Sequence, residues 1–224
     1  MSTATNVIIN IAGNLLATGS GQVIDSGNSG TAALTIQSTL VDGELIFGLI
    51  QGDANGIFIK AGDNWTVDNY GTIYGETAKA INIKGGDDNK ITNQSGAFIK
   101  TDGANAILMW GDDSSDYAQN TIIENYGKIT ADRSTIKAAE FSSGTTITNY
   151  SGGIIQATKT NLSHAAVQID GDNTTITNKG TISGAGTTHS IEVKNGVTGT
   201  KIYVDGAPTF TGEVELTDST VAEY

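Results

Sequence analysis

The sequence contains no cysteine, one proline and, at position 133, one arginine among its 224 residues. Without cysteine there is no disulfide framework, thiolate metal site, thiol nucleophile or attached haem. Basic residues are scarce as well, because 12 lysines and arginines stand against 24 aspartates and glutamates, for a formal net charge of -12. Nucleic acids and anionic membranes bind through clustered basic side chains, so neither is an expected partner.

Long apolar runs are also missing. No stretch approaches the roughly 18 apolar residues that a membrane-spanning helix needs, so we expect no membrane insertion. The first basic residue is Lys60, and we therefore expect no secretory signal with a basic amino-terminal region. No stretch carries a convincing 3.6-residue apolar stripe either, which favours an all-β chain.

The chain has a repeated phrase instead: an apolar residue, a polar one, asparagine, a short turn with glycine, and another apolar residue. Five copies occur, and their asparagines are separated by 24, 32, 24 and 29 residues. The basic unit is therefore about 24 residues, with insertions of 8 and 5 residues. A repeat of this length is typical of solenoids, in which each unit packs only on its neighbours. The five asparagines are Asn69, Asn93, Asn125, Asn149 and Asn178.

Each unit also holds a second run in which apolar and polar residues alternate. Alternation of period two predicts a strand with one buried face. The paired inward residues are predicted to be Ile57 and Ile59, Ile81 and Ile83, Ile107 and Met109, Ala139 and Phe141, Val167 and Ile169, and Ile191 and Val193. In the copies that contain Asn93 and Asn149, the glycine of the repeated phrase comes one position later than in the other three. The next apolar residues, Phe98 and Ile154, are also one position later, and we expect them to enter the core after the turn.

These observations predict a single right-handed parallel β-helix of about 24 residues per turn. Residues 55–204 form its repeats, residues 1–54 an amino-terminal cap or degenerate turns, and residues 205–224 a carboxy-terminal cap or linker. Identical strands would stack at about 4.8 Å and bury a continuous apolar core. The five asparagines would form a ladder in which each side-chain amide bonds to its neighbours.

The residues of the repeated phrase resemble those in the coils of known β-helical proteins. The phrases Ile91-Thr92-Asn93, Ile147-Thr148-Asn149 and Ile176-Thr177-Asn178, continued by Tyr70-Gly71-Thr72-Ile73 or Lys179-Gly180-Thr181-Ile182, are similar to those of autotransporter passenger domains and related bacterial secreted adhesins. The resemblance covers roughly residues 55 to 204. It implies an extracellular or cell-surface stalk or adhesin, and it implies no catalytic residue.

Acidic turns precede several of the asparagine strands. In a stacked solenoid they would follow one corner, where neighbouring carboxylates could form an oxygen-rich Ca²⁺ site. Ordinary Gly-Asp-Asn turn chemistry is the commoner explanation of such residues. No other metal or cofactor is predicted, and His164 and His189 are the only histidines available for a histidine-based centre. The candidate calcium ligands are Asp63, Asp87, Asp88, Asp112, Asp113 and Asp172.

The same acidic corner has a catalytic interpretation. Cleavage of a glycoside by general acid and base needs two carboxylates about 5 to 9 Å apart. Asp112, Asp113 and Asp116, with Asp87 or Asp88, would be the candidates.

The function that the sequence favours is a structural or adhesive module outside a bacterial cell, which binds a glycan or a protein surface through loops and corner side chains. Repeated weak contacts along such a scaffold gain strength through multivalency. The alternatives are a glycan-active enzyme or glycan-binding spike on the same scaffold, and a subunit that self-associates into a surface layer or filament.

Overall fold

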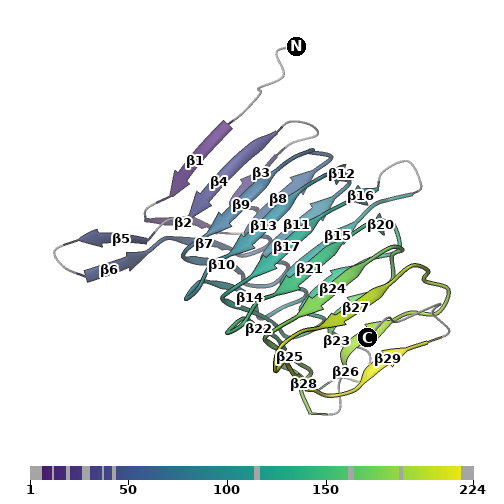
Figure 1. Ribbon diagram of the computed structural model, residues 1–224. Helices are drawn as coiled ribbons and strands as arrows, with labels where there is room; N and C mark the ends of the chain where they lie inside the picture. Colours follow the sequence, from purple (N-terminus) through teal and green to yellow (C-terminus); the bar gives the residue numbers. More distant parts are fainter. Residues whose placement is uncertain are drawn as a thin grey trace.

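The computed structural model describes residues 7–11, 13–18, 21–26, 31–36, 38–41, 44–113, 117–160, 164–186 and 189–217. Within these ranges every regular element is a β-strand, and the strands stack into an elongated solenoid with β1 and β29 at opposite ends (Figure 1). The all-β prediction is thereby confirmed. Among the described residues there is no helix with the length and apolar character required to cross a membrane.

Three eight-stranded sheets form the sides of the solenoid. The sheet that carries the repeated asparagines, here the ladder sheet, contains β1 (Val7–Ile11), β4 (Ala32–Ile36), β9 (Thr66–Asn69), β13 (Lys90–Asn93), β17 (Ile122–Asn125), β21 (Thr146–Asn149), β24 (Thr175–Asn178) and β27 (Lys201–Val204). The second, here the groove sheet, contains β2 (Asn14–Ala17), β7 (Leu49–Gly52), β10 (Thr72–Gly75), β14 (Phe98–Thr101), β18 (Lys128–Ala131), β22 (Ile154–Ala157), β25 (Thr181–Ser183) and β28 (Thr209–Thr211).

The third sheet contains β3 (Ile24–Asp25), β8 (Ile57–Lys60), β11 (Ile81–Lys84), β15 (Ile107–Trp110), β19 (Ile136–Ala138), β23 (Ala165–Ile169), β26 (His189–Val193) and β29 (Val214–Leu216). A short corner sheet joins the third sheet to the ladder sheet and contains β12 (Gly86–Asp87), β16 (Ala118–Gln119) and β20 (Ser142–Ser143). One antiparallel hairpin, β5 (Ser38–Val41) and β6 (Glu44–Phe47), projects from the stack (Figure 1).

Each turn of the chain contributes one strand to each large sheet, and the pairing between turns is parallel throughout these sheets. Asn93, for example, is in register with Asn69 on one side and Asn125 on the other. The parallel β-solenoid is confirmed, and successive ladder positions are 24 to 32 residues apart. Strands from residues 7–52 and from residues 209–216 extend the same three sheets at both ends.

The core consists of stacked aliphatic side chains, most of them isoleucine. Ile73, Ile99, Ile129, Ile155 and Ile182 form one file in the groove sheet, and none of these side chains is exposed to solvent. β-Branched residues favour the extended backbone, and burying an isoleucine stabilises the fold by about 1.5–3 kcal/mol. Equivalent files line the inner faces of the other two sheets.

Two predicted core positions in the groove sheet are wrong. Phe98 pairs with Thr72 and Ile154 pairs with Lys128, all four on the outer face, so the following residues Ile99 and Ile155 enter the core instead. Phe98 is 43% exposed. The turn is two residues longer in these copies, since Phe98 lies five residues after Asn93 whereas Thr72 lies three residues after Asn69. The inward residue therefore comes one position later than expected.

One predicted core pair in the third sheet is also wrong. Ile136 and Ala138 occupy the inward positions beside Ile107 and Met109, where Ala139 and Phe141 were expected. Ala139 and Phe141 are half-buried and lie beyond the end of β19.

The glycine of the repeated phrase is required for two different reasons. In the longer copies the glycine has a left-handed backbone, with φ of 80° at Gly96 and 83° at Gly152. In the shorter copies the turns approach each other too closely for a side chain, since a Cβ at Gly127 would lie 2.4 Å from the carbonyl oxygen of Gln94. Glycine is the residue that tolerates both situations.

Candidate ligand-binding groove

The five ladder asparagines form one continuous file inside the solenoid. The Nδ2 group of each donates to the Oδ1 atom of the next, over 2.8 Å from Asn69 to Asn93 and 2.9 Å from Asn93 to Asn125. The same bond continues over 2.8 Å to Asn149 and over 2.9 Å to Asn178. All five side chains are fully buried. The file therefore satisfies polar groups within the core, and no ladder asparagine is presented to a ligand.

The acidic corner is built by turns with a left-handed residue at the same place in successive coils. Asn64, Asp88, Asn120 and Asn173 have φ between 52° and 58° there. Asparagine and aspartate tolerate this conformation better than most residues, so the turn chemistry explains their presence. Asp63 and Asp87 occupy the preceding position, and the Asp87 amide donates to Asp63 Oδ1 over 2.8 Å.

Asp63, Asp87 and Asp88 are the predicted calcium ligands that lie near one another. Burial, followed by repulsion from Asp63 and then Asp88, raises the pKa of Asp87 above its usual value of 3.8. The Asp88 carboxylate also accepts a hydrogen bond from Asn120 over 3.1 Å. The calcium site stays a prediction, since carboxylates in such turns also serve local hydrogen bonding.

The other predicted acids lie elsewhere. Asp112 forms an ion pair with Lys84, and Gln119 is the residue in register with Asp87, because the 8-residue insertion moves Asp112 and Asp113 ahead of the corner. Asp172 holds the same corner position as Asp63 and Asp87 but lies several coils from them, and it accepts the amide of Thr198 in the adjacent coil over 2.7 Å. The remaining catalytic candidate, Asp116, lies outside the described residues.

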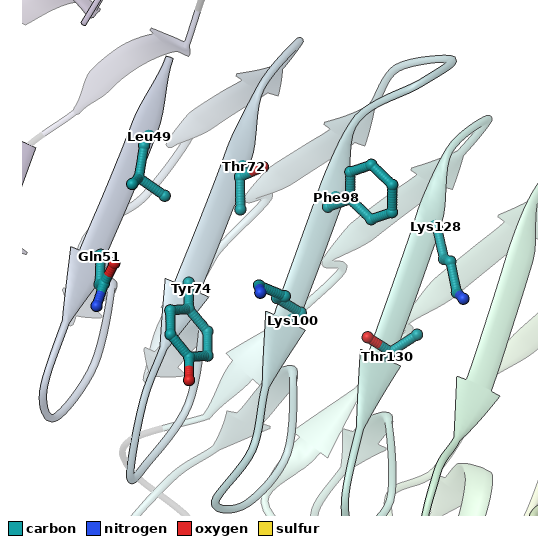
Figure 2. Close-up of a pocket in the computed structure, with 8 residues that line it drawn as sticks. All are labelled: Leu49, Gln51, Thr72, Tyr74, Phe98, Lys100, Lys128 and Thr130. Atoms are coloured by element: carbon teal, nitrogen blue, oxygen red, sulfur yellow. The ribbon is translucent and has the colours of Figure 1, made fainter. Parts of the chain in front are cut away.

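A depression lined by polar and aromatic side chains lies on the outer face of the groove sheet. Four strands, β7, β10, β14 and β18, form this depression of about 560 Å³ (Figure 2). Side chains cross it in two rows that follow the strand register. The first row is Leu49, Thr72, Phe98 and Lys128, and the second is Gln51, Tyr74, Lys100 and Thr130.

Tyr74 lies in the second row of the groove, and its side chain is fixed by two contacts. Its hydroxyl donates to Asp102 Oδ2 over 2.6 Å, and the Lys100 ammonium lies 4.4 Å from the centre of its ring. Burial, the hydrogen bond to Asp102 and the nearby acids together raise the pKa of Tyr74 to about 12. The phenol therefore stays protonated near neutral pH, which suits a stacking surface and hydrogen-bond donor and does not suit a general base.

The groove combines an aromatic floor with hydrogen-bonding groups along its length. The rings of Tyr74 and Phe98 lie on adjacent strands, which are about 4.8 Å apart. Lys100 and Lys128 add donors, and none of the eight lining residues is a carboxylate. An extended molecule with apolar faces and many hydroxyl groups would match this surface along the direction in which the strands stack.

None of these eight residues was identified from sequence as a site residue. The sequence offered one indication of the groove at Phe98. An aromatic residue followed by a second apolar residue leaves open which of the two faces outward, so an exposed aromatic ring was one of two interpretations. Pairing of β10 with β14 resolves that ambiguity.

A second aromatic pair lies on the corner between the ladder and groove sheets. Tyr126 stacks on Tyr150 with ring centres 4.0 Å apart and an interplanar angle of 8°. The two tyrosines follow ladder asparagines of adjacent turns, so the contact is packing between coils. Hydrogen bonding to Tyr150, followed by burial, raises the pKa of Tyr126 to about 12.

Comparisons with known proteins add a distant structural neighbour. No protein-family model matches the sequence, and the search of curated proteins gives no match. Among solved structures, the chain is similar to the crystal structure of alginate lyase from Paenibacillus sp. str. FPU-7, with 11% sequence identity and a TM-score of 0.43. The alignment covers 96% of this chain and 92% of that chain. At this level of similarity the β-solenoid assignment depends on the strand pairing alone.

Proposed function

We propose that the protein is a non-catalytic binding module that holds an extended, hydroxyl-rich glycan in the groove-sheet depression. The observation that carries the proposal is the alignment of Tyr74 and Phe98 with Lys100 and Lys128 on one outer face. Aromatic rings pack against the apolar faces of sugar rings, and the lysine, threonine and glutamine side chains can bond to sugar hydroxyls.

The charge of the molecule narrows the class of glycan. A formal net charge of -12 repels a dense polyanion, whereas two lysines in the groove tolerate a sparse negative charge. We therefore propose an uncharged or sparsely charged glycan. An adhesive role at a bacterial surface, as the repeat resemblance implies, would use several weak contacts of this kind together.

The test measures binding of defined oligosaccharides by isothermal titration calorimetry. Xylo-, manno- and cello-hexaoses serve as uncharged probes, and hexagalacturonate serves as the charged arm. We expect at least one uncharged probe to bind more tightly than hexagalacturonate. The Phe98→Ser variant should lose about tenfold in affinity, since stacking on one aromatic ring contributes about 0.5–1.5 kcal/mol and about 1.4 kcal/mol corresponds to tenfold.

The matched control is Tyr203→Ser. Tyr203 is 37% exposed, close to the 43% of Phe98, but it lies on the outer face of the ladder sheet. This variant should bind as the unmodified protein does. Failure of every probe to bind, or equal affinity in Phe98→Ser, would contradict the proposal. Release of shorter sugars from a probe, lost in Asp112→Asn or Asp113→Asn, would instead support the enzymatic alternative.

A further inference from the structure

The last two turns of the solenoid carry a cluster of histidine and glutamate side chains on the third sheet, away from the groove. His189 and Glu192 belong to β26, and Glu215 belongs to the neighbouring strand β29. One nitrogen or oxygen atom from each of the three residues lies within 4.8 Å of the other two. Glu192 and Glu215 are in register, so both carboxylates project from the same face.

The cluster contains buried polar atoms that the protein leaves without a hydrogen bond. Glu192 is 5% exposed, and its Oε2 atom is buried and accepts no hydrogen bond. The Nδ1 atom of His189 is also buried without a hydrogen bond, although it lies 3.1 Å from Glu215 Oε2. A buried carboxylate oxygen without a partner is costly, and a bound cation would remove that cost.

The charges around the cluster leave a net negative environment. Glu213 adds a third carboxylate, with Oε2 at 3.6 Å from His189 Nε2. The ammonium group of Lys194 contacts Glu192 Oε1, which leaves the other oxygen atom of that carboxylate open.

We propose that His189, Glu192 and Glu215 form a binding site for a divalent transition-metal ion of the Zn²⁺ class. The imidazole Nδ1 atom and two carboxylate oxygens are ligands that zinc accepts, with water in the fourth position, while Glu213 lies beside the opposite ring nitrogen, Nε2. Calcium needs six to eight oxygen ligands, so it fits this site poorly. Atoms that share one tetrahedral zinc ion lie about 3.4 Å apart, and the ligand atoms of the three residues lie within 4.8 Å of one another. The Glu215 side chain is 42% exposed and so has room to adjust.

The site would join β29, the terminal strand of the third sheet, to β26. Parallel pairing of three residues holds β29 in place, and its side chains are only half-buried. A metal ion bridging the two strands would add a cross-link at this end of the stack, where β26 is the one described strand that pairs with β29. Its role would be structural, independent of the glycan groove.

The test titrates ZnCl₂ into the metal-free full chain, with isothermal titration calorimetry as the readout. We expect one Zn²⁺ ion per chain and an affinity at least tenfold lower in His189→Gln and in Glu215→Gln. Addition of Co²⁺ should produce visible absorption bands that are absent in His189→Gln.

The control variant is His164→Gln, which removes the other histidine and should leave zinc affinity unchanged. The ligand variants are compared only after their melting transitions show that they fold, and Glu215→Gln is the safer of the two because its side chain is partly exposed. Absence of Zn²⁺ binding to the unmodified chain would overturn the proposal. It would also be overturned if both ligand variants bound Zn²⁺ with the affinity of the unmodified chain. A zinc-induced rise in melting temperature that persists in His189→Gln would also overturn it.

Discussion

One carboxylate at the acidic corner, that of Asp87, opposes the folded state near neutral pH. Burial and the neighbouring Asp63 and Asp88 raise its pKa. A carboxyl group with a raised folded-state pKa binds protons more readily when the chain is folded. It therefore favours folding below its unfolded-state pKa near 3.8, and that contribution is lost as the pH rises through the raised folded-state value.

We expect Asp87→Asn to stabilise the protein at pH 7. The variant removes the unfavourable charge while the Asp87 backbone bond to Asp63 can persist. The melting temperature should rise by about 1–2 °C, a small effect because the Asp87 side chain is only partly buried. The difference should shrink as the pH is lowered towards 3. Glu76→Gln removes the same charge from an exposed position between β10 and β11, away from the acidic corner, and an equal rise in that variant would contradict the local explanation.

Residue by residue, the sequence pattern predicts the buried files well where a single apolar residue follows the turn. Ile73 and Ile129 are examples, each with a polar residue before it. The prediction is wrong at Phe98, where two adjacent apolar residues compete for one inward position. Only the pairing with the neighbouring strand decides between them, because a shift of one residue moves a side chain to the opposite face.

At the scale of the elements, the ladder sheet depends on a chain of amides that have one direction. Every Nδ2 group donates towards the carboxy-terminal end, and the file stops at Asn178 because Val204 is the next residue in register. The Nδ2 group of Asn178 is consequently buried without a hydrogen-bond partner. A central member of the file should therefore matter more than the terminal one.

We expect Asn125→Ala to lower the free energy of unfolding by about 2–4 kcal/mol. The change removes the acceptor of Asn93 and the donor to Asn149, and each buried group left unpaired costs about 1–3 kcal/mol. Asn178→Ala is the matched control and should cost less than half as much. Urea denaturation measures both values, and equal costs would show that the directional bonding is unimportant.

At the acidic corner, the sequence motif predicts the turn but does not determine which side chains of neighbouring coils lie together. Gly-Asp-Asn motifs predict turns, and the positive φ angles of Asn64 and Asn173 fit that interpretation. The sequence places Asp112 and Asp113 in a similar motif, but the longer coil moves them out of the stack and brings Gln119 beside Asp87. Insertions thus preserve the strands while changing which polar side chains meet.

For the whole molecule, the repeat length predicts the architecture but not the sites. The spacing of five asparagines is enough to infer a parallel solenoid, since one turn must return each amide to the same side. Sites depend instead on outward residues, which the core does not constrain. The groove uses outward residues from four turns, and the His189 cluster combines residues from two strands of the last coils.

Stability should be graded along the stack, because each coil contacts only the coils beside it. Amides of β13, β17 and β21 have neighbouring strands on both sides, whereas β29 is a terminal strand. We expect hydrogen exchange in the central strands to be at least about tenfold slower than in β27–β29, which corresponds to about 1.4 kcal/mol of opening free energy. Mass spectrometry of exchanged peptides measures this difference, and uniform exchange along the chain would indicate a single cooperative unit.

The unequal coil lengths have a practical consequence. Strand register is unbroken although one ladder interval is 32 residues and its neighbours are 24. Extra chain is therefore accommodated at the corner without disturbing either adjoining rung. A foreign peptide grafted beside Asp113 would therefore be displayed at a fixed position along the solenoid axis. Grafts in the corresponding corners of other coils would be spaced by multiples of the coil-to-coil distance, so the protein could serve as a scaffold for epitopes at defined separations.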